Sequence, residues 1–158
     1  MSRAKNLEVL TESATQTEQI ARIIGSNLKG GECIEMSSDI GGGKTTFTRG
    51  LVYGAGSIDA VSSPTFTIGK QYIAKKLLIY HFDFYRLHEP GLVAEELQEA
   101  LENPNAVIVV EWAETVQKVL PNDRIKIIFE RVATHEDNRT IRISALEELT
   151  YLLKGISS

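Results

Sequence analysis

Cysteine is almost absent from this sequence, and so are apolar runs long enough to cross a membrane. The single thiol, Cys33, cannot form a disulfide within the chain, which excludes a disulfide-stabilised scaffold. The longest apolar run, Ala106–Val110, is far shorter than the roughly 20 residues that a membrane helix needs. The start, Met1–Asn6, is polar and is followed by no apolar stretch typical of a signal peptide. We therefore expect a cytoplasmic protein that does not associate with membranes.

An excess of positive charge is missing as well. The 158 residues include 17 Lys and Arg against 21 Asp and Glu, which gives a net charge of −4. Tight binding of nucleic acid needs a basic surface that displaces counterions, so this composition argues against a stand-alone nucleic-acid-binding protein. Apolar residues make up 42% of the chain, an ordinary fraction for a globular protein. The length predicts a single domain over residues 1–158.

Strand-like and helix-like segments alternate along the chain, which predicts an α/β fold. We expect a three-layer sandwich of the P-loop NTPase type, with a mixed, mainly parallel central sheet and antiparallel hairpin strands. Residues around His135 and Asp137 are expected to form a polar loop between the last two strands. The expected helices are Ser13–Leu28, Lys44–Tyr53, Leu92–Leu101 and Ala145–Leu153. The expected strands are Leu7–Leu10, Glu32–Met36, Thr65–Ile73, Leu77–Phe84, Asn105–Glu111, Arg124–Phe129 and Thr140–Ser144.

A glycine-rich segment between an expected strand and an expected helix is the strongest functional motif. It fits the phosphate-binding pattern G-x-x-x-x-G-K-[ST], with Ser38 in place of the first glycine. Backbone N–H groups of such a loop surround an anion, and the helix N-terminus adds partial positive charge. Lys44 would reach the β- and γ-phosphates of a bound nucleotide, and the Thr45 hydroxyl would ligate Mg²⁺. The expected phosphate-binding residues are Asp39, Ile40, Gly41, Gly42, Gly43, Lys44, Thr45 and Thr46. The alternative is a flexible turn with an incidental lysine.

Two acids at strand ends suggest metal and water chemistry beside this loop. Asp83 ends one apolar strand and Glu111 ends another, and carboxyl ends of such strands face the ligand in open α/β sheets. Thr65 follows a proline in a loop that resembles a nucleotide-sensing switch. The alternatives are solvated acids and a simple threonine at a strand start. His81 has no Cys or His neighbour at metal spacing, so we expect no zinc site.

Four motifs follow one another along the chain: Gly41–Phe47 (GGGKTTF), Ser63–Thr67 (SPTFT), His81–Leu87 (HFDFYRL) and Glu111–Glu114 (EWAE). With these motifs in this order, the chain resembles the TsaE family over nearly its whole length. TsaE proteins are small bacterial P-loop ATPases required for making threonylcarbamoyladenosine in tRNA. The chain departs from the family pattern at three positions. The family usually has glycine, alanine and proline where this chain has Ser38, Gly42 and Ala113.

The resemblance implies a mechanism and partners. It implies ATP hydrolysis that is weak alone and depends on a TsaB–TsaD assembly, in which TsaD transfers the threonylcarbamoyl group to tRNA. With little positive charge of its own, the chain is expected to meet tRNA mainly through those partners. The resemblance implies that Lys44 binds phosphate and that Thr65 belongs to a switch-like loop. Thr45 would ligate Mg²⁺, and Glu111 would complete the Mg²⁺ shell, directly or through water. Asp83 would orient or activate the attacking water, and Trp112 would lie near the nucleotide.

Two other functions remain open from the residues alone. One is a small-molecule kinase, but such enzymes generally need an arginine-bearing lid. Only Arg131, Arg139 and Arg142 occur late in the chain, without a lid-sized insertion. The other is a nucleotide-binding adaptor without turnover. Asp83 and Glu111 argue against an adaptor, and Ser38 in a glycine position argues for it.

Overall fold

The computed structural model describes residues 3–38, 43–62, 69–85 and 91–157, and these ranges contain one seven-stranded sheet. The strand order is β1-β7-β6-β2-β5-β4-β3. The strands are β1 (Ala4–Thr11), β2 (Cys33–Ser37), β3 (Gly69–Ala74), β4 (Leu77–Asp83), β5 (Ala106–Glu111), β6 (Ile125–Val132) and β7 (His135–Leu146). The helices are α1 (Ala14–Asn27), α2 (Lys44–Gly54) and α3 (Gly91–Glu102), with the 3₁₀ helices η1 (Ala113–Val116) and η2 (Glu147–Leu153).

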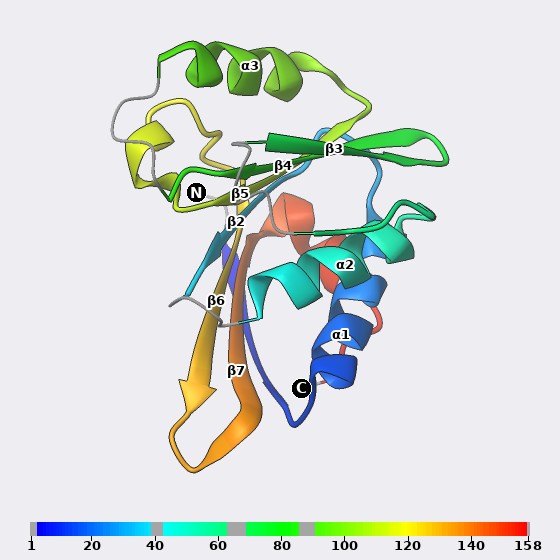
Figure 1. Ribbon diagram of the computed structural model, residues 1–158, viewed down its shortest axis with the longest axis vertical. Coiled ribbons are helices and arrows are strands. Elements are labelled where there is room, and N and C mark those ends of the chain that lie inside the picture. The colour runs from blue at the N-terminus through cyan, green and yellow to red at the C-terminus, as the bar shows by residue number, and fades with distance from the viewer. Residues whose placement is uncertain (1–2, 39–42, 63–68, 86–90, 158) are drawn as a thin grey trace.

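The four central strands, β6, β2, β5 and β4, are parallel, and the three outer pairings are antiparallel. The helices α1 and α2 cover one face of the sheet and α3 covers the other (Figure 1). The predicted α/β sandwich with a mixed sheet and hairpin strands is therefore confirmed. The predicted hairpin between β3 and β4 is present, with its turn at Lys75 and Lys76.

The strand β5 shows why the centre of the sheet is parallel and apolar. All six of its residues are buried. Val107 and Val109 pack in the core under α1 and α2, whereas Ala106, Ile108 and Val110 pack in the core under α3. A strand covered by helices on both faces needs apolar residues at every position, which is the pattern of this segment.

The two helices on one face begin in different ways. At α1 the hydroxyl oxygen of Ser13 accepts a hydrogen bond from the backbone N–H of Gln16 at 3.2 Å, which is the usual N-cap arrangement. At α2 the cap is Gly43, whose φ of 105° lies in the left-handed region that favours glycine. Gly43 therefore turns the chain directly into Lys44, the first residue of α2.

Glycines allow α1 and α2 to touch backbone to backbone. A Cβ atom on Gly25 of α1 would lie 2.1 Å from the carbonyl oxygen of Leu51. A Cβ on Gly50 of α2 would lie 2.3 Å from the carbonyl oxygen of Glu18. Both distances are too short for any side chain, so the position of α2 depends on these residues remaining glycine.

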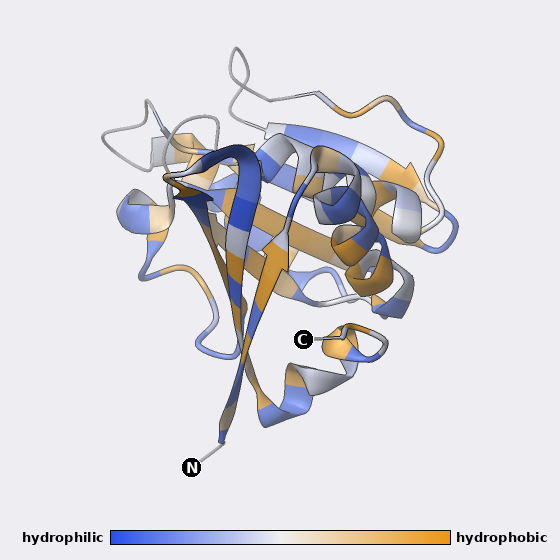
Figure 2. Cartoon of the chain, turned by 90° about the horizontal axis from the view of Figure 1, so that it is seen from below, coloured by the Kyte–Doolittle hydropathy of each residue, from blue (hydrophilic) through white to orange (hydrophobic). Residues whose placement is uncertain are grey.

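Two expectations for the last third of the chain are wrong. The polar loop around His135 and Asp137 is part of a long hairpin, in which β6 runs to Val132 and β7 starts at His135. The beginning of β7 is exposed or half-buried at every position, so no apolar alternation marks it as a strand. In Figure 2 this hairpin projects toward the viewer and is mainly hydrophilic near its turn.

The expected C-terminal helix at Ala145–Leu153 is the second error. Ala145 and Leu146 extend β7, because they pair with Lys5 and Ala4 of β1. The remainder, Glu147–Leu153, is a 3₁₀ helix rather than an α-helix. Its Leu149, Leu152 and Leu153 still pack into the core beneath α1, as an apolar helical face would.

No helix within the described ranges is both long and apolar enough to span a membrane.

Candidate functional site

Lys44 occupies the first position of α2 and is almost fully buried, with 8% of its surface exposed. Its ammonium nitrogen donates to the backbone carbonyl oxygen of Ser38 at 3.3 Å. It also lies 4.0 Å from Oε1 of Glu111 and 4.7 Å from the centre of the Trp112 ring. A buried ammonium group requires such partners, since an isolated charge in the interior is very costly. The cation is thus held beside the chain that leads into the glycine-rich loop.

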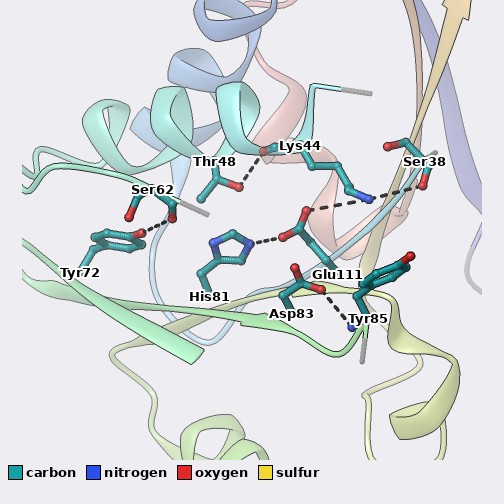
Figure 3. Close-up of polar contacts among 9 residues, drawn as sticks. All are labelled: Ser38, Lys44, Thr48, Ser62, Tyr72, His81, Asp83, Tyr85 and Glu111. Carbon is teal, nitrogen blue, oxygen red and sulfur yellow. Dashed lines mark hydrogen bonds and ion pairs between the residues drawn. The ribbon is translucent and has the colours of Figure 1, made fainter. Parts of the chain in front are cut away.

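Glu111 reaches Lys44 because of the register of the parallel strands. It is the last residue of β5, and it is paired with Met36 of β2 on one side and with Asp83 of β4 on the other. Glu111 is 3% exposed. One of its carboxylate oxygens faces Lys44, and the other, Oε2, lies 2.7 Å from Nε2 of His81. Figure 3 shows Glu111 between Lys44 and His81, with Asp83 beside it.

Asp83 is the second acid at this edge of the sheet. Partial burial raises the pKa of its carboxyl group, and the neighbouring Glu111 carboxylate raises it further. The backbone N–H of Tyr85 donates to Oδ1 of Asp83 at 3.0 Å and opposes this rise. A carboxyl group with a raised pKa is a better proton acceptor when ionised than an ordinary one, which is a property expected of a group that activates water.

An aromatic pair closes the site on the side of β5. The rings of Tyr85 and Trp112 are 4.8 Å apart at their centres and tilted by 52°. Trp112 has φ 56° and ψ 55°, and it is the one non-glycine residue with positive φ in the described part of the chain. A bulky side chain rarely adopts this conformation, and residues held in it are frequent at functional sites. Trp112 directly follows Glu111 in the chain, and in this conformation its ring lies next to the Lys44 ammonium group.

The structure brings most of the predicted site residues to one edge of the sheet. Lys44, Asp83, Glu111 and Trp112 lie together, as the contacts above show. Thr45 and Thr46 are half-buried in the first turn of α2, directly after Lys44. Gly43 is the N-cap of α2, directly before Lys44. The remaining predicted residues lie outside the described ranges, and they are Thr65 of the predicted switch-like loop and Asp39, Ile40, Gly41 and Gly42 of the predicted phosphate-binding loop.

Two members of this cluster were not expected from the sequence. The sequence places His81 in the HFDFYRL motif and indicates no role for it, and its contact with Glu111 joins residues 30 positions apart. Tyr85 was known only as part of a motif, and its partner Trp112 is also distant in the sequence. The alternation of β4 offers one signal for the histidine. His81 and Asp83 are two residues apart and so lie on the same face of the sheet as each other.

Comparisons with known proteins agree with this geometry. The family model "Threonylcarbamoyl adenosine biosynthesis protein TsaE" matches residues 11–141. The tRNA threonylcarbamoyladenosine biosynthesis protein TsaE of Bacillus subtilis (strain 168) is 35% identical over 143 residues, which are 90% of this chain and 87% of that protein. The protein of the same name from Streptomyces coelicolor is 33% identical over 134 residues, covering 82% of this chain and 90% of the relative.

A solved structure gives the same result. The crystal structure of YdiB from Bacillus subtilis superimposes with a TM-score of 0.77 at 31% sequence identity, covering 97% of this chain and 94% of that one. The family match covers the glycine-rich segment, both strand-end acids and Trp112. The chain therefore belongs to the TsaE family, whose members take part in the biosynthesis of threonylcarbamoyladenosine in tRNA.

Proposed function

We propose that this protein is a Mg²⁺-dependent ATPase. The observation that carries the proposal is the buried contact set of Lys44, in which a cation at the N-terminus of α2 faces the carboxylate that ends β5. A lysine after a glycine-rich loop and an acid at the end of a neighbouring parallel strand are the two parts that P-loop enzymes use to hold phosphate and magnesium. The positive end of the α2 dipole adds to the attraction for phosphate.

The donor groups at this edge fit Mg²⁺ bound together with a nucleotide. Mg²⁺ prefers oxygen ligands, keeps several waters and is usually held by one or two protein groups plus substrate phosphates. Thr45 and Glu111 would supply the protein oxygens, Glu111 directly or through a water. Bound Mg²⁺ would neutralise charge on the phosphates.

The residues of the chain would divide the remaining work. Lys44 would exchange its contact with the Ser38 carbonyl for the β- and γ-phosphates, while the backbone of Asp39–Gly43 and the side chain of Thr46 surround them. Asp83, with its raised pKa, would orient the attacking water and accept its proton. Thr65 would contact the terminal phosphate from the switch-like loop. Trp112 would lie against the bound nucleotide, because its ring already lies beside Lys44.

The biological role follows from the family and the charge of the chain. The relatives are named for biosynthesis of threonylcarbamoyladenosine in tRNA, and we propose the same pathway for this protein in the cytoplasm. We further propose that it acts on a TsaB–TsaD assembly. A net charge of −4 supports contact with tRNA mainly through those partners, because a chain of this charge offers little attraction for a polyanion.

Phosphate release from ATP with and without a TsaB–TsaD complex tests this proposal. We expect slow release that needs Mg²⁺ and rises when the complex is added. Lys44→Ala should lower both ATP affinity and phosphate release by roughly 100-fold or more, since removing a single donor that stabilises negative charge in a transition state, as in an oxyanion hole, typically costs about 10²–10³ in rate. Unchanged release in Lys44→Ala would contradict the assignment of the phosphate-binding loop.

The same assay separates the two alternative functions. A parallel screen for phosphorylated small acceptors addresses the kinase, and transfer to an acceptor faster than hydrolysis would favour that enzyme. Tight binding of ATP with no phosphate release, with or without the complex, would favour an adaptor without turnover.

A further inference from the structure

The two ring nitrogens of His81, the buried histidine of β4, have different surroundings. His81 is fully buried, and its Nε2 lies 2.7 Å from Oε2 of Glu111. Its Nδ1 is buried and has no hydrogen-bond partner among the residues that the structure describes. A buried polar atom without a partner costs about 1–3 kcal/mol. An apolar side chain would avoid that cost, so the contact with Glu111 accounts for an imidazole at this position.

The chemistry of the contact fixes which nitrogen carries the proton. A carboxylate has only acceptors, so the hydrogen between the two groups belongs to Nε2 of His81. His81 thus directs the N–H of Nε2 at one defined oxygen of Glu111.

This donor decides how the carboxylate of Glu111 is turned. Oε2 is occupied by His81, and Oε1 faces Lys44 at 4.0 Å. Asp83 is the neighbour of Glu111 across β4 and β5, and the two carboxyl groups repel each other. Without a donor on Oε2, Lys44 would be the one remaining charged partner of Glu111 among the residues that the structure describes. Lys44 is the residue that must release its contacts when phosphate binds.

We propose that His81 is a positioning residue, which holds Glu111 by Oε2 so that Oε1 remains turned toward Lys44 and the Mg²⁺–nucleotide site. This inference rests on the proposed function, because Glu111 acts there on Mg²⁺. In this role His81 would contact neither nucleotide nor metal itself. Its effect passes through Glu111 alone, in the way that outer hydrogen-bond partners orient the ligands of a metal.

Two amide substitutions separate this role from a structural one. The side-chain nitrogen of Gln reaches close to the place of histidine Nε2, whereas that of Asn reaches close to the place of Nδ1. His81→Gln therefore keeps a donor for Glu111, and His81→Asn moves the donor away. Loss of such an outer partner typically costs 10–100-fold in metal affinity or activity. The exposed His135, changed to Asn, is the matched control for the substitution itself.

The measurement is ATP binding at increasing Mg²⁺, followed by the fluorescence of Trp112, the single tryptophan of the chain. We expect His81→Asn to raise the half-saturating Mg²⁺ concentration about 10- to 100-fold. His81→Gln and His135→Asn should stay within about threefold of wild type. ATP binding in excess chelator should be equal in all four proteins. Thermal unfolding of each variant checks that the chain is folded at the assay temperature.

Three results would overturn the proposal, and each contradicts a different part of it. If His81→Asn responds to Mg²⁺ like wild type, the histidine does not position Glu111. If the folded His81→Gln loses as much as His81→Asn, the ring serves packing rather than hydrogen bonding. If wild-type protein binds ATP without any response to Mg²⁺, the proposed function itself fails. Only the last result is observed with wild-type protein, so failure of the proposed function can be distinguished from failure of the role proposed for His81.

Discussion

Charged groups form ion pairs in two regions of the sheet, and the two regions differ in burial and in surroundings. At the carboxyl end of β5, Glu111 is buried between His81 and Lys44. On the uncovered face of the antiparallel strands, Arg142 of β7 pairs with Glu8 at 2.9 Å and with Glu130, and these side chains are about half exposed. Water screens the second set, whereas no solvent replaces a partner lost from the first.

This difference shows that the length of an ion pair says little about its role. The contact between Lys44 and Glu111 is the longest of the described ion pairs, at 4.0 Å. It is nonetheless the contact that faces the glycine-rich segment and the acid Asp83. The shorter Arg142 contacts join strands that are already paired by backbone hydrogen bonds. Burial and surroundings, rather than length, therefore distinguish the charges that we propose to be functional.

Removing the acid from the buried region should have the largest effect. We expect Glu111→Ala to lower Mg²⁺-dependent phosphate release by roughly 100-fold or more, as commonly follows from losing a group that organises charge at a phosphoryl centre. ATP affinity in excess chelator should change much less, because Lys44 is retained. A variant whose Mg²⁺ titration matches wild type would contradict the metal role of Glu111 and transfer it to Asp83.

A third ion pair sharpens the comparison, because it is also buried but lies on the other face of the sheet, where Val110, the strand partner of Glu35, packs under α3. Arg124 donates through Nε to Oε2 of Glu35 at 2.6 Å, and its other nitrogens donate to Gln117 and to the Pro121 carbonyl. Breaking a buried pair of this kind typically costs about 3–5 kcal/mol, since the remaining charge stays unpaired. We expect Arg124→Ala to lower the free energy of unfolding by about 3 kcal/mol, measured by urea denaturation.

The same variant should bind Mg²⁺ and ATP with wild-type affinity wherever it is folded. Equal binding would show that burial alone does not make an ion pair functional. A large loss of affinity in the folded Arg124→Ala protein would mean that the two buried pairs are coupled across the sheet.

The smallest effect is expected in the exposed region. Arg142→Ala removes both contacts with Glu8 and Glu130, yet solvent takes the place of each partner. We expect a thermal midpoint and a rate of phosphate release that match wild type. A clear drop in the midpoint in low salt that disappears in high salt would show that the open sheet face depends on these charges.

Much of the site could be predicted because its parts are local. The glycine-rich segment stands between a strand and a helix, and Asp83 and Glu111 each end an apolar run, so their common edge follows from parallel pairing. The contact of His81 with Glu111 could not be found in this way. It depends on which strands are neighbours, and apolar runs do not reveal strand order.

The two incorrect predictions of secondary structure have a related cause. Periodicity detects a strand only where one face is buried, and the first half of β7 around His135 is buried on neither. At the end of β7, the sequence around Ala145 predicts a helix, but pairing with β1 makes this residue part of the strand. Both incorrect predictions concern antiparallel strands, whereas the predicted strands of the parallel centre are present in the structure.

The backbone contact between α1 and α2 has a consequence for how variants of this protein should be judged. Gly25 and Gly50 make no side-chain contacts, because they have no side chain. Alanine is ordinarily a mild replacement for glycine in a helix. Here an added methyl group would meet a carbonyl oxygen of the other helix and push the two helices apart. Because α2 begins with Lys44, that movement would displace the cation that we propose to bind phosphate. Substitutions at these glycines should therefore be judged together with those at the proposed nucleotide site, although Gly25 and Gly50 are not part of it.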